Sequence, residues 1–135
     1  MLAGGCATTT TELVRIEYAV TDNPDQRKIE LTYRNVSDAA MCLLPEHWPN
    51  SAGKINQASD VVSLVVGRER FPLKSFNTGY CPEGCAIRVE SGAVASAFIA
   101  YEDFALPDRA TKEPKTLDFS PVTFKCGAHA GRPTK

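Results

Sequence analysis

Short runs of alternating apolar and polar residues, separated by turn-forming residues, constrain the fold of this chain more than any other feature. Such alternation is typical of strands with one buried face. Residues 12–20 and 28–36 both alternate, and the turn-forming cluster at residues 21–25 lies between them. We therefore expect the two runs to form an antiparallel pair. The side chains expected on the buried faces are those of Val14, Ile16, Tyr18, Val20, Ile29, Leu31 and Tyr33.

The rest of the chain repeats this pattern. Further strands are expected at residues 39–44, 60–66, 71–74, 87–89, 94–101, 115–119 and 122–126. A charged turn is expected at residues 67–70, Pro72 should mark an edge or a strand end, and residues 102–114 form a polar connection. Helical spacing is not sustained anywhere. The sequence thus predicts an all-β protein, an antiparallel immunoglobulin-like β-sandwich of about seven to nine short strands with two disulfides.

One domain accounts for the whole chain. Its 135 residues are 43% hydrophobic, which is enough for a single core. We assign residues 12–126 to the β-sandwich and residues 127–135 to a flexible tail, because the tail has no apolar period. The longest apolar runs, at 61–66 and 93–101, are too short to cross a bilayer. The net charge is −1 and no basic stripe is visible, so nucleic acid is not an expected partner.

The first residues suggest a lipid anchor. Residues 2–6, Leu-Ala-Gly-Gly-Cys, resemble the lipobox of bacterial lipoproteins, in which the cysteine is lipidated. The resemblance implies lipidation at Cys6, a truncated lipobox and flexible tether over residues 1–11, and, with Ala7 after the cysteine, an outer-membrane lipoprotein facing the periplasm. Only five residues precede Cys6, so the charged and apolar regions of a signal peptide are missing. The alternative is an ordinary flexible start with a chance cysteine.

The remaining cysteines indicate an oxidising compartment. Cys42, Cys81, Cys85 and Cys126 form an even set in a small domain, and three pairings are possible. We favour Cys81–Cys85, because three intervening residues that include Pro and Gly let the ends approach each other. Cys42 and Cys126 would then tie an early strand to the last one. Such disulfides persist outside the reducing cytoplasm.

Two irregular segments are candidate partner-binding surfaces. The loop at residues 45–57 holds His47 and Trp48, the only tryptophan. Long loops are often functional, although Trp48 could equally fold over the end of the core. In the second segment, residues 76–85, a disulfide would pin Tyr80, Pro82 and Glu83 in a protrusion that costs little entropy to bind. The alternative is a segment cross-linked for stability alone.

The order of these elements resembles a known class. Residues 34–38 (Arg-Asn-Val-Ser-Asp), a cysteine-bearing strand, a long proline-bearing loop and residues 89–92 (Val-Glu-Ser-Gly) before a long strand are similar to small extracytoplasmic immunoglobulin-like modules of bacteria. Some of those modules act as proteinase inhibitors. The resemblance implies a fold and no functional residue. Residues 35–37 also match a glycosylation sequon, which we interpret as a turn.

Metal and catalytic chemistry find weaker support. Cys81, Cys85, Cys126 and His129, with Cys42 and His47 in addition, could bind zinc as thiolates and imidazoles. A copper site from Met41, Cys42, His47 and His129 can also be drawn. The zinc site is not favoured, because disulfides would consume the thiols, and the copper site is not favoured, because His129 lies in a tail with nothing to anchor it. No cofactor is therefore expected. There is no Gly-x-Ser-x-Gly elbow and no partner that would orient a catalytic histidine, so no catalytic residue is assigned.

We therefore expect a non-catalytic, envelope-anchored binding module, an inhibitor or immunity-type protein that acts on a periplasmic enzyme. Its partner would be an envelope protein, and it would meet the membrane only through an N-terminal lipid anchor. The alternatives are a structural or accessory lipoprotein of an envelope complex and a small zinc- or copper-binding protein.

Overall fold

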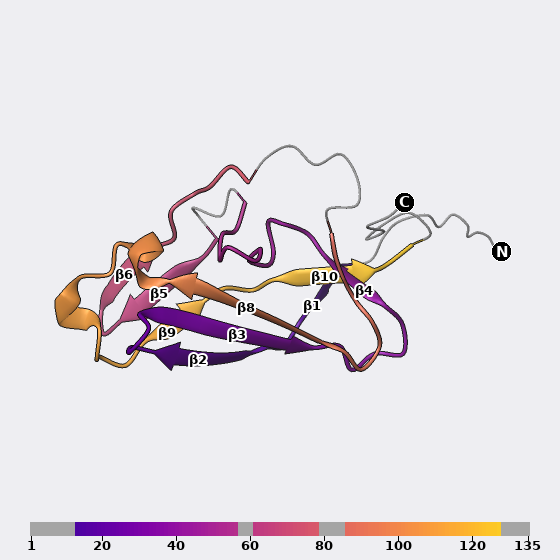
Figure 1. Ribbon diagram of the computed structural model, residues 1–135, viewed down its shortest axis with the longest axis horizontal. Helices are drawn as coiled ribbons and strands as arrows, with labels where there is room; N and C mark the ends of the chain where they lie inside the picture. The colour runs from indigo at the N-terminus through magenta and orange to yellow at the C-terminus, as the bar shows by residue number, and fades with distance from the viewer. Residues whose placement is uncertain (1–12, 57–60, 79–85, 128–135) are drawn as a thin grey trace.

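The computed structural model describes residues 13–56, 61–78 and 86–127, and these form an all-β protein (Figure 1). The prediction of the all-β class is thus confirmed. The strands are β1 (Leu13–Arg15), β2 (Ala19–Asn23), β3 (Lys28–Arg34), β4 (Met41–Leu43), β5 (Ser63–Val66), β6 (Glu69–Pro72), β7 (Ile87–Val89), β8 (Val94–Ala100), β9 (Thr116–Asp118) and β10 (Val122–Lys125). Two short 3₁₀ helices, η2 (Tyr101–Phe104) and η3 (Asp108–Ala110), lie between β8 and β9.

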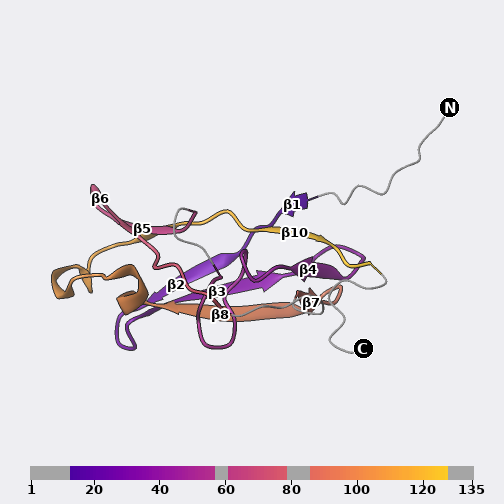
Figure 2. The same cartoon turned by 90° about the horizontal axis from the view of Figure 1, so that it is seen from above.

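The strands form three antiparallel sheets, with the orders β1-β10-β4-β7, β2-β3-β8 and β6-β5-β9. Figure 2 shows β1, β5, β6 and β10 along one side of the molecule and β2, β3 and β8 along the other. The apolar side chains of both sides meet in one core. Along the sequence, consecutive strands belong to different sheets except in the pairs β2 and β3, and β5 and β6.

The first predicted strand is broken in the structure. Instead of one strand over residues 12–20, β1 pairs with β10, residues 16–18 cross over, and β2 pairs with β3. The Ile16 N–H still donates to the Pro121 carbonyl at 3.3 Å, and Ile16 is buried. Val14 and Val20, both expected inside, are exposed because β1 and β2 are edge strands. The predicted turn begins later than residue 21, since β2 continues to Asn23.

The pair formed by β3 and β8 is the centre of the fold. All seven residues of β3 pair with β8, from Lys28 opposite Ala100 to Arg34 opposite Val94. The predicted inward residues Ile29, Leu31 and Tyr33 are all buried. The alternation in β3, which is paired on both edges, therefore correctly predicted which of its side chains face the core.

A buried asparagine holds the turn that follows β3. The Asn35 side chain is 1% exposed, and its amide nitrogen donates to the carbonyls of Ala39 and Val89, both at 2.8 Å. Its amide oxygen accepts from the Ser37 N–H at 3.0 Å and from the Ser37 hydroxyl at 2.6 Å. The sequon asparagine is thus a turn anchor whose amide is already bonded, in agreement with its interpretation as a turn.

The hairpin of β5 and β6 is close to the prediction. Its turn is shorter than expected, with Gly67 at φ +60° and β6 beginning at Glu69. Only glycine adopts this backbone region at little cost. Pro72 is the last residue of β6, which is an edge strand, as predicted.

The connection at residues 101–115 carries more of the core than its polar composition suggests. Tyr101, Phe104 and Leu106 are buried there. The buried carboxylate of Asp103 pairs with the Lys54 ammonium at 2.8 Å, which compensates its loss of water. Single apolar residues without a period carry no strand signal, so the sequence indicated only a polar linker.

One of the two predicted disulfides lies within the described residues. Cys42 and Cys126 are bonded, which joins β4 to the end of β10. The other predictions about the ends and the second cysteine pair fall outside the described ranges: Cys6, the tether, Tyr80, Cys81, Pro82, Glu83, Cys85, His129 and residues 128–135 of the tail.

Candidate functional site

Trp48 is a core residue, which corrects its assignment to a partner-binding surface. Its side chain is 1% exposed, and its ring makes edge contacts with Tyr18 and Tyr33 at centroid distances of 6.1 and 6.2 Å. A large apolar ring gains most by leaving water, and here it fills the space between the two sides of the sheet assembly. Trp48 therefore offers no surface to a partner.

His47 is half-buried beside Trp48. The Nδ1 atom of its ring accepts a hydrogen bond from the backbone N–H of Val122 at 3.4 Å. The backbone N–H of His47 donates to the Leu44 carbonyl at 2.9 Å. The first contact joins the loop to β10, and the second closes a turn within the loop. Of the five predicted partner-binding residues, His47 and Trp48 are described, and the structure brings them to the inner side of this loop rather than to its tip.

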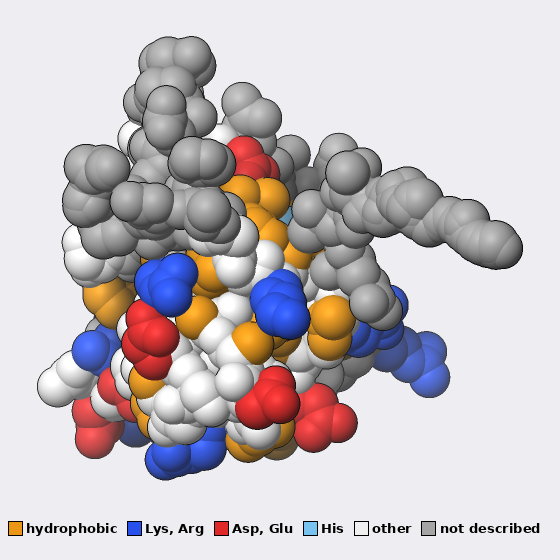
Figure 3. Space-filling view, turned by 90° about the vertical axis from the view of Figure 1, so that its right-hand side faces the viewer, with side chains coloured by type: hydrophobic (Ala, Val, Ile, Leu, Met, Phe, Trp, Pro, Cys, Tyr) orange, Lys and Arg blue, Asp and Glu red, His pale blue; other side chains and the backbone are white. Residues whose placement is uncertain are grey.

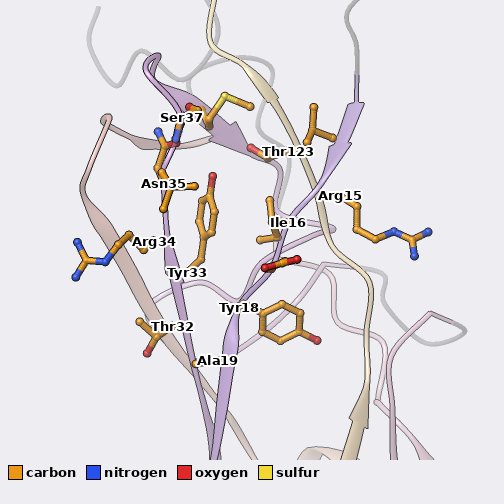
Figure 4. Close-up of a pocket in the computed structure, with 14 residues that line it drawn as sticks. Arg15, Ile16, Tyr18, Ala19, Thr32, Tyr33, Arg34, Asn35, Ser37 and Thr123 are labelled. Atoms are coloured by element: carbon orange, nitrogen blue, oxygen red, sulfur yellow. Dashed lines mark hydrogen bonds between the residues drawn. The ribbon is translucent and has the colours of Figure 1, made fainter.

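A cavity lies where β2 and β3 separate. Their pairing ends at Ala19 opposite Thr32, and beyond this pair the two segments diverge toward different sheets. Residues 14–19, residues 32–37, Met41 and Thr123 line a cavity of about 710 Å³ between them (Figure 4). We call this set of residues the fork.

The interior of the fork is mostly apolar, with one hydroxyl that has no partner. Figure 4 shows the ring of Tyr33 between Asn35 and Ile16. Thr123 is satisfied, because its hydroxyl donates to the Cys42 carbonyl at 2.6 Å. The amide of Asn35 is satisfied by the turn described above. The Tyr33 hydroxyl makes no hydrogen bond within the described part of the chain and is open to the cavity, because no buried side-chain oxygen there lacks a partner.

The rim of the fork combines exposed apolar side chains with unpaired cations. Val36 is 87% exposed and Val14 is 43% exposed. Figure 4 shows Arg15 and Arg34 reaching outward on opposite sides of the cavity. Figure 3 views this end of the molecule and shows hydrophobic side chains between single basic and acidic ones, rather than one large apolar patch.

The phenols of Tyr18 and Tyr33 keep their protons at ordinary pH. Burial, with a smaller effect of the Asp118 carboxylate, raises the pKa of Tyr18 to about 12, and the Tyr18 hydroxyl donates to the Phe119 carbonyl at 2.6 Å. Burial also raises the pKa of Tyr33. The fork therefore presents a neutral hydroxyl at ordinary pH.

A second polar cluster, Asp22 with Tyr101 and Lys115, is structural. The Tyr101 hydroxyl and the buried Lys115 ammonium both donate to the Asp22 carboxylate, the ammonium at 2.7 Å. Lys115 also donates to the carbonyls of Thr111 and Glu113, at 2.6 and 2.9 Å. Burial and then the Asp22 hydrogen bond raise the pKa of Tyr101. A phenol that holds its proton this firmly is a poor base.

The zinc and copper alternatives lose ligands in the structure. Cys42 and Cys126 are joined in a disulfide and have no thiolate to offer. Within residues 13–56, 61–78 and 86–127, no three His, Cys, Asp or Glu side chains gather in a way that could hold a metal ion.

Comparisons with known proteins add no candidate residue to this site. Neither a scan of protein-family models nor searches of curated proteins and of solved structures found a match to this chain. Among the described residues, no helix is long and apolar enough to cross a membrane. The fork itself escaped the sequence analysis, because the alternation in residues 12–20 continues without a break at the point where the chain changes sheets.

Proposed function

We propose that this chain is a non-catalytic binding module of the bacterial envelope, an inhibitor or immunity-type protein that acts on a periplasmic enzyme. The observation that carries the proposal is the Cys42–Cys126 disulfide across an all-β body. Structural disulfides are rare in the reducing cytoplasm and common in exported proteins. A rigid sheet framework that presents connecting segments is a frequent means of recognition.

Two features of the sequence support the finer parts of the proposal. The lipobox-like residues 2–6 support lipidation at Cys6 and an outer-membrane anchor. An immunoglobulin-like arrangement is supported by the antiparallel sheets and by the chain order that resembles extracytoplasmic modules. In that arrangement, His47 and the residues Tyr80, Pro82 and Glu83 belong to connections between strands, where a partner would be contacted.

Capture of the partner tests the proposal. The full chain, purified with its disulfide intact, is immobilised and exposed to detergent-solubilised envelope extract, and retained proteins are cross-linked and identified by mass spectrometry. The expected result is one saturable partner whose enzymatic activity falls in proportion to the amount of chain added. The matched control is the same chain after reduction and alkylation.

Two outcomes would contradict this function. A partner without enzymatic activity that belongs to an envelope complex would favour the accessory lipoprotein. If the chain retains no more of any protein than the control does, the proposal of a binding module is wrong.

A further inference from the structure

The fork leaves a short length of strand edge without a neighbour. The Asn35 N–H donates to the Ala93 carbonyl at 2.9 Å, and the Asn35 carbonyl accepts from the Gly92 N–H at 2.7 Å. Both backbone groups of Asn35 therefore face the β8 side. Successive residues of a strand direct their backbone groups to opposite edges, so those of Arg34 face the side on which β2 has already ended.

The segment across the gap does not fill this edge. In the register of β2 with β3, the residue opposite Arg34 would be Glu17. Residues 16–18 have instead turned toward β10, and no backbone hydrogen bond joins Glu17 to Arg34 in the described structure. An open edge of this kind is a template for another extended segment.

The unpartnered hydroxyl of Tyr33 lies beside this edge. This hydroxyl makes no hydrogen bond to the residues that the structure describes, and Figure 4 shows its ring inside the fork. Its oxygen is open to the cavity, because every buried side-chain oxygen of the described residues has a partner. A ligand that enters the fork can supply the missing partner.

The charges at the rim favour an acidic occupant. Four other arginines of the described chain pair with a carboxylate within 3.3 Å: Arg27, Arg70, Arg88 and Arg109. Arg15 has no such partner among the described residues, and Arg34 donates only to the Gly92 carbonyl at 3.0 Å. Among the residues that line the cavity, these two cations outnumber the one carboxylate, that of the exposed Glu17. The net positive charge would be complemented by carboxylates on an incoming segment.

We propose that the fork binds an extended polypeptide segment of a partner protein by strand addition. The segment hydrogen-bonds to the backbone of Arg34, places an apolar side chain between Tyr33 and Ile16, and carries acidic residues that meet Arg15 and Arg34. Main-chain hydrogen bonds supply affinity in this mode, and the pocket for an alternate side chain supplies specificity. The inference rests on the proposed binding function and names the site and the chemistry of its partner.

A library of random octapeptides displayed on phage, selected against the full disulfide-bonded chain, is the probe. The expected winners alternate apolar residues and contain Asp or Glu. They are then made as synthetic peptides and titrated by the fluorescence of Trp48, the only tryptophan, whose ring contacts Tyr33. Binding should weaken with salt, and N-methylation of one backbone amide of the peptide should abolish it.

Variants of the chain locate the site. Tyr33→Phe should weaken binding roughly threefold to tenfold by removing one neutral hydrogen bond without loss of folding stability. Arg15→Glu should weaken binding by about the same factor through charge repulsion. The matched control is Arg68→Glu, because Arg68 is also an exposed arginine without an ion pair among the described residues but lies in the turn between β5 and β6.

Three results would overturn the inference. The first is selection of no alternating acidic peptides. The second is a peptide affinity of Tyr33→Phe and of Arg15→Glu equal to that of the original chain. The third is self-association of the chain that Arg15→Glu abolishes, which would make a second copy the occupant. If the captured envelope partner still binds the Arg15→Glu chain as well as the original, this site fails while the binding function stands. Failure of capture itself removes the function.

Discussion

At the scale of single residues, Asn35 shows how one buried polar side chain holds two connections at once. It bonds to Ala39 in its own turn and to Val89 at the end of β7, which is far away in the sequence. Within the described residues, no buried side-chain nitrogen or oxygen is left without a partner. Because these hydrogen-bonding groups are all paired, removing the Asn35 amide lowers the stability of the fold, since the two carbonyls are then buried without a donor.

Asn35→Ala should lower the free energy of unfolding by about 2–4 kcal/mol, because two carbonyls lose their donor and the amide leaves a cavity. Chemical denaturation monitored by Trp48 fluorescence measures the loss. Val36→Ala, at the exposed neighbouring position, is the control and should change stability by less than about 0.5 kcal/mol. A loss for Asn35→Ala as small as that of the control would show that the turn does not depend on this amide.

Substitutions at Gly53 and Gly92 distinguish two costs of adding a side chain, backbone strain and steric overlap. Both have φ of +80°, but a Cβ on Gly53 would lie 2.6 Å from Cε2 of Phe98, whereas a Cβ on Gly92 would meet nothing within 4 Å. Gly92→Ala should cost about 1–2 kcal/mol for the left-handed backbone. Gly53→Ala should cost about 1–3 kcal/mol more, because Phe98 must move.

Thermal or chemical unfolding of the two glycine variants gives this difference. Repeating Gly53→Ala in a Phe98→Ala background should remove the extra cost and leave the backbone part. If the extra cost survives in that background, the overlap with Phe98 is not its origin.

At the scale of strands, β10 ties the sheet of β1 and β4 together. It pairs with β1 on one edge and with β4 on the other, and the disulfide joins the middle residue of β4 to the residue that follows β10. The bond spans 84 residues of sequence, so it restricts a large part of the unfolded chain. Its effect should therefore be global rather than local to the two strands.

Replacing both Cys42 and Cys126 with Ala should lower the free energy of unfolding by about 4–5 kcal/mol on the chain-entropy model. Denaturant unfolding of the variant against the oxidised chain measures the change, and reduction of the original chain should reproduce most of it. Hydrogen exchange should rise first in β1, β4 and β10. A change below about 1 kcal/mol would mean that the closed loop is already restricted in the unfolded state.

At the scale of the whole molecule, the raised pKa values of the tyrosines make stability depend on alkaline pH. A phenol whose pKa is higher in the folded state keeps its proton there while the unfolded chain loses it. The contribution is therefore complete below the unfolded pKa and is lost as pH rises through the folded one. For Tyr18 this window runs from about pH 10 to about pH 12.

We accordingly expect the denaturation midpoint to fall as pH rises from 10 to 12, and the phenolate absorbance to appear late in the folded chain. The Tyr18→Phe variant should show a shallower fall over the same window, because one of the linked protons is gone. A midpoint that stays constant across this range would contradict the assignment of Tyr18 to a protonated, buried hydrogen bond.

The sequence by itself determined the class of the fold and much of its strand map. Alternation with a period of two depends only on neighbouring residues, so it correctly placed β3, β5, β7, β8 and β10 and the inward faces of Ile29, Leu31 and Tyr33. It also favoured, among three possible pairings, the one that joins Cys42 to Cys126, and the structure contains this bond.

Only the tertiary structure decided where the chain changes sheets, that Trp48 is buried, and that the fork is open. Each depends on contacts between distant residues, such as Ile16 with Pro121 and Tyr33 with Trp48. Local pattern contains no information on which sheet a strand joins, since an inward side chain satisfies either one. The candidate site lies at that undetermined point, which is why it could be found only in three dimensions.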